Sequence, residues 1–402
     1  HTRLDVKGKV YEPTDPNSTR LKNLQYTAQS TRADVSRWMS LDSSGVNLPE
    51  QFTFSGRSTG SIDQLTTKNQ LTTTAGNIKL EGALTQKKGL LEYELITHVE
   101  QLQVGEIINN PKVGSITATV ETKGKGESLS TLDASLTSRF DSLSYSGYDF
   151  TALQISGNIN NGKGGLDMNY KDDNLNMDLS SDIELDSVNT LAKLTLDLKG
   201  VDFLALGITN EDVRAQLRLD ARFEGNAENF TAGLALENLT VVKNQDSYTP
   251  GQINLTSCVT PDSTSLQITS DVLRGNLLSN TNPQGFLQAV NRQFHEYLNV
   301  DPTEESIPLD SNIVVTSNFS IRESPLISDI LLPQLETYDS ITFSIDYHQN
   351  QDSLVASFNA PYIKYGNSVI DSLRFELLGA PDNLQFSGGW ASIDADPVLL
   401  KS

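Results

Sequence analysis

The segment from Arg214 to Glu224 alternates apolar and polar side chains at every position. Its odd-numbered residues are alanine, leucine or phenylalanine, and its even-numbered residues are charged residues or glutamine. Successive side chains of a β-strand point to opposite faces, so this segment predicts a strand with one apolar face and one wet face. The same period of two recurs along the chain. It predicts a mainly β protein whose antiparallel sheet faces water on one side.

The segment from Val99 to Gly126 predicts the local unit from which this sheet is built. It opens with the end of the alternating strand Leu91–Val99 and continues into one helical turn, Val104–Asn109. Pro111 stops the turn, because proline cannot continue a helix, and a second alternating strand follows. Looser copies of this strand, short helix and strand predict one continuous repeat region. Its approximate units are 1–95, 96–190, 191–300 and 301–402.

Turn signals between the strands predict a meander of hairpins. Asn160-Asn161-Gly162 is a two-strand turn signal, and strands around Ile345 and Ala356 are expected to pair across a polar turn. A short helix is expected at Thr31–Met39. One longer helix is predicted at Asn282–Asn299, with Asn282 as its N-cap; it either packs over a sheet or forms a lid over an apolar groove.

The charge of the chain excludes several classes of partner. The net charge is −21 with a pI near 4.5, whereas binding to nucleic acid requires a surface of Lys and Arg. The same charge disfavours docking on an anionic membrane surface. An acidic, solvated exterior is the simplest interpretation. The single cysteine, Cys258, excludes an internal disulfide, and it is expected on the wet side of a strand.

No motif in the sequence predicts catalysis, a cofactor or a metal site. The four histidines, at positions 1, 98, 295 and 348, are far apart, and no zinc-binding spacing, nucleophile elbow or phosphate-binding loop is present. The chain is therefore predicted not to be an enzyme. No apolar run is long enough to span a bilayer and no signal peptide opens the sequence, so we expect a piece of a larger protein.

An apolar face of this length can be buried in three ways. Two sheets can pack as a β-sandwich, a sheet can close into a water-soluble barrel, or it can curl into an open trough whose apolar face shields ligands. A glycan-binding sandwich is a weaker alternative, for which Trp38 and Trp390 are the only tryptophan platforms.

Several segments resemble the repeats of the TamB branch of the AsmA-like family, in particular the large versions from Bacteroides-type bacteria. The similarity covers about Thr31 to Leu378 and consists of alternation and glycines. The segments that carry it are Leu102–Thr117, Val120–Gly126, Tyr145–Phe150, Leu153–Gly157, Leu175–Leu179 and Ala205–Thr209.

This resemblance implies a fold and a location. Such proteins, named for the translocation and assembly module, are anchored in the inner membrane and extend through the periplasm as a β-taco, an elongated open trough of antiparallel strands. They are thought to act in outer-membrane biogenesis, as conduits for phospholipid or as partners of a barrel-assembly protein. The membrane anchor and the domain that meets the outer membrane would both lie outside this sequence, so membrane contact is expected only through those parts.

Two functions follow as hypotheses. The first is a non-enzymatic conduit whose apolar groove binds phospholipid acyl chains. The second is a rigid periplasmic scaffold that presents strand edges or its acidic outer face to a protein partner, and so assists insertion or secretion of outer-membrane proteins. For the first, the residues predicted to line the groove are Ile116, Ala118, Val120, Leu153, Ile155, Leu194, Leu196, Leu198, Leu217, Leu219, Phe223, Val315, Phe319 and Ile345.

Overall fold

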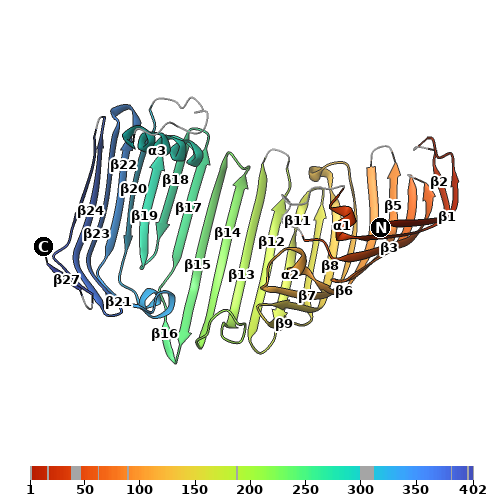
Figure 1. Ribbon diagram of the computed structural model, residues 1–402, viewed down its shortest axis with the longest axis horizontal. Helices are drawn as coiled ribbons and strands as arrows, with labels where there is room; N and C mark the ends of the chain where they lie inside the picture. The colour runs from red at the N-terminus through yellow and green to blue at the C-terminus, as the bar shows by residue number, and fades with distance from the viewer. Residues whose placement is uncertain are drawn as a thin grey trace. The chain divides into compact units, whose positions relative to one another are not determined.

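Antiparallel β-strands make up most of the computed structural model (Figure 1). It describes residues 2–15, 18–37, 47–61, 63–87, 90–186, 189–298, 312–381, 383–395 and 398–401. The chain divides into two compact units. Unit 1 comprises His1–Ser187 and Leu196–Val213, and unit 2 comprises Val188–Thr195 and Arg214–Ser402.

Unit 1 is a meander in which each strand pairs with the next along the chain. The pairing runs without interruption from β1 to β8, continues from β8 to β10, and reaches β12 through β11. The strands are β1 (Arg3–Tyr11), β2 (Arg20–Thr31), β3 (Gln51–Ser61), β4 (Gln64–Thr73), β5 (Gly76–Lys87), β6 (Leu90–Gln103), β7 (Val113–Gly126), β8 (Asp133–Tyr145), β9 (Tyr148–Phe150), β10 (Leu153–Asn160), β11 (Lys163–Lys171) and β12 (Leu175–Glu184). The short β9 adds to β8.

Strand β13 (Thr190–Asp202) is shared between the two units, and the remaining strands belong to unit 2. They are β14 (Val213–Gly225, whose first residue falls in unit 1), β15 (Phe230–Lys243), β16 (Asp246–Tyr248), β17 (Ile253–Thr260), β18 (Ser263–Thr269), β19 (Leu273–Ser279), β20 (Val314–Ile321), β21 (Leu335–Tyr338), β22 (Ile341–His348), β23 (Ser353–Tyr365), β24 (Ser368–Ala380), β25 (Asn383–Gly389), β26 (Ser392–Ala395) and β27 (Val398–Lys401). Neighbours pair in the order β15, β17, β18, β19, β20, β22, β23, β24, β25.

Helices are few and mostly short. They are α1 (Arg32–Val35), α2 (Val104–Ile107) and α3 (Pro283–Leu298), with 3-10 turns at Leu129–Thr131 and Gln349–Gln351 and a π-helical turn at Leu326–Leu331. Asn282 caps α3 as predicted, because its Oδ1 accepts a hydrogen bond from the Gly285 N–H at 2.8 Å. The expected helix at Thr31–Met39 is shorter than predicted, and Trp38 and Met39 lie outside the described residues.

The predicted open antiparallel sheet is confirmed. The strands form a sheet that does not close on itself, so the packed sandwich, the alternative left open by the sequence, is wrong. The alternating segment Arg214–Glu224 is strand β14. The Asn160–Gly162 signal joins β10 to β11, and Asn161 and Gly162 adopt φ of 49° and 73°, as a two-residue hairpin turn of this kind requires.

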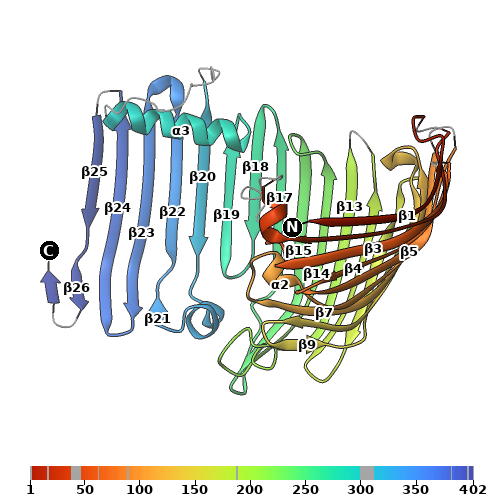
Figure 2. The ribbon, with the colours of Figure 1, turned by 45° about the vertical axis from the view of Figure 1, so that its right-hand side comes forward.

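The best-defined core of unit 2 lies between α3 and the ends of several strands. Ala289 of α3 packs with Ile313, Val315, Tyr347 and Leu354, each no more than 4% exposed. Figure 2 shows α3 running across strands β19 to β24 at one end of unit 2. The long helix therefore packs over a sheet, the first of the two arrangements expected for it.

Candidate functional site

A row of phenylalanines crosses the apolar face of unit 2. The register places Phe319 opposite Phe343, Phe343 opposite Phe358, and Phe358 opposite Phe375. Directly paired residues of antiparallel strands point to the same face, so these four rings, on β20, β22, β23 and β24, share one side of the sheet. We call them the phenylalanine row.

The phenylalanine row is only half covered. Phe343 is 40% exposed and Phe375 is 37% exposed. The ring centroids of Phe358 and Phe375 lie 6.2 Å apart, and the ring of Phe386 from β25 stacks on Phe375 at 5.8 Å. Phe386 is itself 66% exposed. A band of aromatic surface is therefore exposed to water, which is unfavourable unless a ligand or partner covers it.

Helix α3 covers another part of the same face, the part that contains Val315 and Ile345. The helix buries Val315 to 1% exposure, and Ile345 packs at the margin of the core. Phe319 lies four residues beyond Val315 on β20, on the same face, but outside the α3 core. One apolar face thus has a closed end and an open middle. Of these three predicted lining residues, Phe319 and Ile345 are the accessible ones.

The predicted lining residues of unit 1 also share one face. Ala118 and Leu153 both pair with Phe140, and Val120 and Ile155 both pair with Ser138. Ile116 precedes Ala118 by two residues and lies on the same side of β7. The five residues therefore belong to one face, where Phe140 and Ser138 of β8 lie between β7 and β10. Ala118 and Leu153 are buried at 3% and 6% exposure, whereas Ile116, Val120 and Ile155 are half-buried.

The remaining predicted lining residues lie on β13 and β14. Leu194, Leu196 and Leu198 alternate along β13, and Leu217, Leu219 and Phe223 alternate along β14; all six are half-buried. Phe223 stacks on Phe230 with ring centroids 5.5 Å apart. Through the pairing of Phe230 with Val259, this contact joins the apolar side of β14 to the apolar face of unit 2.

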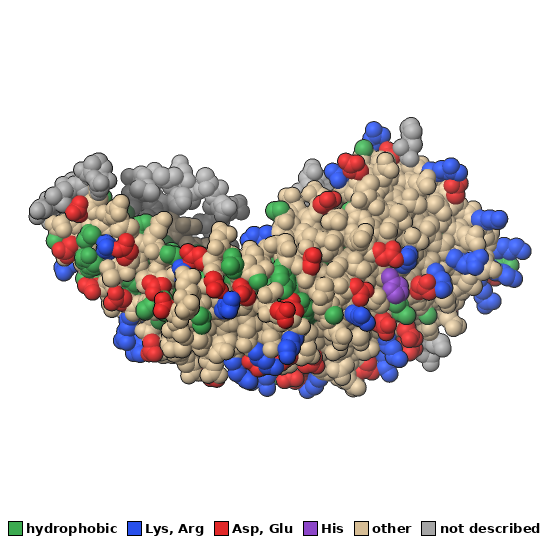
Figure 3. Space-filling model, turned by 90° about the horizontal axis from the view of Figure 1, so that it is seen from below, with side chains coloured by type: hydrophobic (Ala, Val, Ile, Leu, Met, Phe, Trp, Pro, Cys, Tyr) green, Lys and Arg blue, Asp and Glu red, His purple; other side chains and the backbone are tan. Residues whose placement is uncertain are grey.

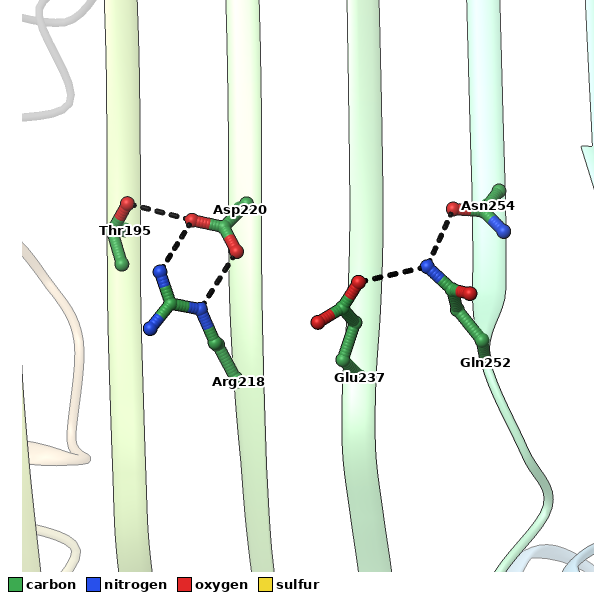
Figure 4. Close-up of polar contacts among 6 residues, drawn as sticks. All are labelled: Thr195, Arg218, Asp220, Glu237, Gln252 and Asn254. Carbon is green, nitrogen blue, oxygen red and sulfur yellow. Dashed lines mark hydrogen bonds and ion pairs between the residues drawn. The ribbon is translucent and has the colours of Figure 1, made fainter.

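The opposite face of unit 2 is polar and held by local pairs. On β14 the Arg218 guanidinium contacts the Asp220 carboxylate, and the Thr195 hydroxyl donates a hydrogen bond to the same carboxylate (Figure 4). Further along, the Gln252 side-chain amide donates to Glu237 at 2.9 Å and to Asn254 at 3.3 Å. Figure 3 shows acidic and basic side chains interspersed on the molecular surface, with hydrophobic side chains between them.

One cluster of titratable groups lies in unit 1, where Asp172 accepts hydrogen bonds from the hydroxyls of Tyr148 and Tyr170. Burial raises the pKa of Asp172, but these hydroxyls and the N–H groups of Asn174 and Leu175 outweigh it and hold the pKa below its usual value. Burial, with the nearby carboxylate, raises the pKa of both tyrosines. The cluster closes the turn between β11 and β12, and its carboxylate and phenol groups are hydrogen-bonded to one another.

No group of three or more His, Cys, Asp or Glu side chains among the described residues could hold a metal ion. Within the same residues, no helix is long and apolar enough to cross a membrane. Cys258 lies on the polar face, opposite Thr231 and Ser265, as the alternation of its strand predicts, and it is half-buried.

Sequence reasoning named Phe319 as a lining residue but missed Phe343, Phe358, Phe375 and Phe386. Each of the four stands at an apolar position of an alternating strand, so its face was predictable. Their assembly into one row depends on the register of successive hairpins. The predicted pairing across the polar turn after His348 is confirmed, since Ile345 lies opposite Ala356. The pairings of β20 with β22 and of β23 with β24, which complete the row, were not predicted.

Comparison with known proteins finds no counterpart for this chain. No protein-family profile, no curated protein and no solved structure matches it.

Proposed function

We propose that this chain is a non-enzymatic lipid-binding segment whose apolar face takes up phospholipid acyl chains. The observation that carries the proposal is the phenylalanine row, which stays half exposed, whereas α3 seals another part of the same face. Each methylene of an acyl chain that leaves water gains roughly 0.8 kcal/mol. A chain lying along the row would cover Phe343 and Phe375 and gain this energy at every carbon.

The sequence resemblance supports a more specific form of the proposal. In that form the chain is the periplasmic repeat region of a TamB-like protein of the AsmA-like family, and the lipid moves between the inner and outer membranes. Its partner at the outer membrane would be a barrel-assembly protein, reached through parts outside this sequence. The proposal assigns the chain no catalytic residue, no metal and no cofactor.

Photo-crosslinking tests the proposal at the row itself. The chain is incubated with vesicles of phosphatidylethanolamine and phosphatidylglycerol that contain a phospholipid with a diazirine in its acyl chain. Labelled peptides are then mapped by mass spectrometry after irradiation. We expect labels on β20, β22 and β23 around Phe319, Phe343 and Phe358. Replacing Phe343 with Asp should abolish most labelling, because a carboxylate in the row would have to be desolvated by the acyl chain.

Val355 supplies a matched control. It lies on β23 beside the row but points to the polar face, opposite Leu378, and its exposure of 36% is close to that of Phe343. Val355→Asp should leave labelling unchanged. Equal labelling of the parent chain and Phe343→Asp, or labels confined to the polar face, would contradict the proposal.

A second candidate function, a scaffold for a protein partner, is favoured by strand β1. Every residue of β1 is exposed, and the pairing described for it is with β2 alone. Leu4 and Val6 are 65% and 56% exposed on such a strand, which is a template for adding a strand from another chain. Cross-linkers placed at Lys7 on β1 and at Arg218 on the polar face of unit 2 would test this. Capture of one defined envelope protein, without lipid at the phenylalanine row, would favour the scaffold.

A further inference from the structure

The polar face of unit 2 contains a hollow of about 1050 Å³. Its lining comes from strands β15, β17, β18, β19, β20, β22 and β23, with Arg222 from β14 at its border. The register places one polar row through its middle: Thr256 opposite Gln267, Gln267 opposite Asn276, Asn276 opposite Asn318, and Asn318 opposite Ser344. We call these five residues the amide row.

The amide row lies behind the apolar face that the proposed lipid function uses. Its residues alternate along each strand with those of that face, so the row points to the other side of the same sheet. Adjacent strands are about 4.8 Å apart, and the row therefore extends for roughly 19 Å. This is a binding length for an extended ligand rather than for a single small molecule.

The amides at the centre of the row are not engaged by the rest of the described chain. Among the described residues, no hydrogen bond engages the side chains of Gln267, Asn276 or Asn318, although each lies beside another polar group. Each amide offers one acceptor and two donor hydrogens. Gln267 and Asn318 are exposed and Asn276 is half-buried, so water can reach all three amides in the free protein. A ligand that covers these amides must supply hydrogen bonds in place of those to water, which favours a polar ligand over an apolar one.

The charges around the hollow are already neutralised. Its lining contains no Asp or Glu, and its two cations have local partners. Arg222 Nη2 is 2.7 Å from Glu224 Oε2, and Arg274 donates from Nε to the Ser270 carbonyl at 2.9 Å with Asp271 3.7 Å away. A strongly charged ligand would find no unpaired counter-ion.

A second hollow, on the polar face of unit 1, has the opposite chemistry. It encloses about 590 Å³ and is lined by Glu92, Glu94, Lys123, Lys125 and Asp133, among other residues. Lys125 and Asp133 are 3.5 Å apart. Charged side chains of both signs thus fill the polar hollow of unit 1. The neutral amides and hydroxyls in unit 2 are a property of that site and not of every polar hollow on this chain.

We propose that the hollow of unit 2 binds a neutral oligosaccharide lying across the strands along the amide row. A sugar chain carries hydroxyl groups that both donate and accept, at intervals along an extended and uncharged backbone, and amide side chains match each of these groups. Gly233 widens the hollow at β15, because a Cβ there would have Leu255 O as its nearest neighbour at 4.0 Å. The hydroxyls of Thr256 and Ser344 continue the row on either side of the amides.

Cys258 supplies a reporter inside the hollow. It is the only cysteine of the chain, it is half-buried, and it belongs to the lining. Its alkylation by iodoacetamide is measured by mass spectrometry with and without cellohexaose or chitohexaose, and affinity is measured by titration calorimetry. We expect both neutral hexasaccharides, or one of them, to slow alkylation and to bind with millimolar affinity.

Two variants alter the lining of the hollow and leave Cys258 unsubstituted. Asn276→Leu removes the central amide and should weaken binding about threefold to tenfold, the value of one hydrogen bond. Gly233→Tyr fills open space and should abolish protection of Cys258. Gln385→Leu is the control, because Gln385 is exposed on the same face of β25 but does not line the hollow. Circular dichroism melts verify that each variant is folded.

Three outcomes would overturn the proposal. The first is normal alkylation of Cys258 at millimolar concentrations of both neutral hexasaccharides. The second is binding that Asn276→Leu and Gly233→Tyr leave unchanged. The third is binding of an acidic oligogalacturonate in preference to the neutral chains. Phe319 and Phe343 also belong to the lining of the hollow, but none of these variants alters a phenylalanine and Cys258 lies on the polar face. The lipid function and the oligosaccharide site are therefore tested separately.

Discussion

The side chains of Arg218 and Asp220 lie on the same face of β14, two residues apart, with Arg218 Nε 2.9 Å from Asp220 Oδ2. Thr195 on β13 donates a hydrogen bond to the other carboxylate oxygen at 2.7 Å (Figure 4). The hydrogen bond from Arg218, and then that from Thr195, lowers the pKa of Asp220 below its usual value. Both bonds favour the charged carboxylate, so they tie the stability of this strand pair to pH.

Asp220 should stabilise unit 2 only while it is ionised. Its pKa is lower in the folded than in the unfolded protein, so its contribution is complete above about pH 4 and disappears as the pH falls through the folded pKa. The pair is partly exposed and screened by solvent, so we expect less than about 1 kcal/mol. Asp220→Asn should reduce the acid dependence of the unfolding free energy, measured in urea between about pH 2 and pH 6. Arg218→Gln should do the same, and the double variant should add little. A full acid dependence in Asp220→Asn would contradict this assignment.

A charge at position 219 should be tolerated, unlike a charge at position 315. Leu219 is half-buried on the apolar side of β14, where water can reach a carboxylate. Val315 lies 1% exposed beneath α3. We expect Leu219→Asp to cost less than about 2 kcal/mol of unfolding free energy. Val315→Asp should cost about 3–5 kcal/mol, because its charge would be buried without a partner. Guanidinium denaturation measures both, and a collapse of the Leu219 variant would contradict an open apolar face.

Tyr347 should hold α3 against the sheet. Its side chain is fully buried, and its hydroxyl donates a hydrogen bond to Gln293 Oε1 at 3.3 Å. Tyr347→Ala should destabilise unit 2 by about 3–5 kcal/mol, because it leaves a cavity between helix and sheet. Tyr347→Phe keeps the ring and should cost about 1–3 kcal/mol. Hydrogen exchange of the α3 amides should accelerate strongly in the alanine variant. Unchanged exchange there would show that other contacts position the helix.

Gly105 should be irreplaceable in the turn of helix α2. A Cβ at this position would lie 1.8 Å from the carbonyl oxygen of Val113, which belongs to the backbone and cannot move aside cheaply. Gly105→Ala should therefore cost about 1–3 kcal/mol. Gly200, also in unit 1, has no atom within 4 Å of the corresponding position. Gly200→Ala should be neutral or stabilise by up to about 1 kcal/mol, through a less flexible unfolded chain. Thermal melts compare the two directly, and equal effects would contradict the steric argument.

Period-two alternation predicted the strands because each strand has one wet face and one apolar face. The segment Arg214–Glu224 lies within β14, and the signal at Asn161 and Gly162 lies at the tip of a hairpin. The N-cap of α3 was also readable, since capping depends on residues close in sequence. In these cases the information that decides the structure is local.

The state of the apolar face depends on distant contacts and could not be predicted from alternation. Val315 and Phe319 occupy equivalent positions of one strand, yet α3, whose first residue lies about thirty residues before Val315, seals only Val315. The hollow behind the face was missed for the same reason. Its amides come from separate strands, and their alignment follows from the register of several hairpins.

The neighbour-to-neighbour pairing of unit 1 has a consequence for how such a chain can change in length. From β1 to β8 each strand touches the one before it and the one after it, so stability is close to a sum of local hairpin terms, as in repeat proteins. Removing or duplicating a whole hairpin leaves every other interface intact and preserves the side on which apolar residues fall. Growth by hairpins would lengthen the sheet gradually, and folding could begin at any hairpin and spread to both sides.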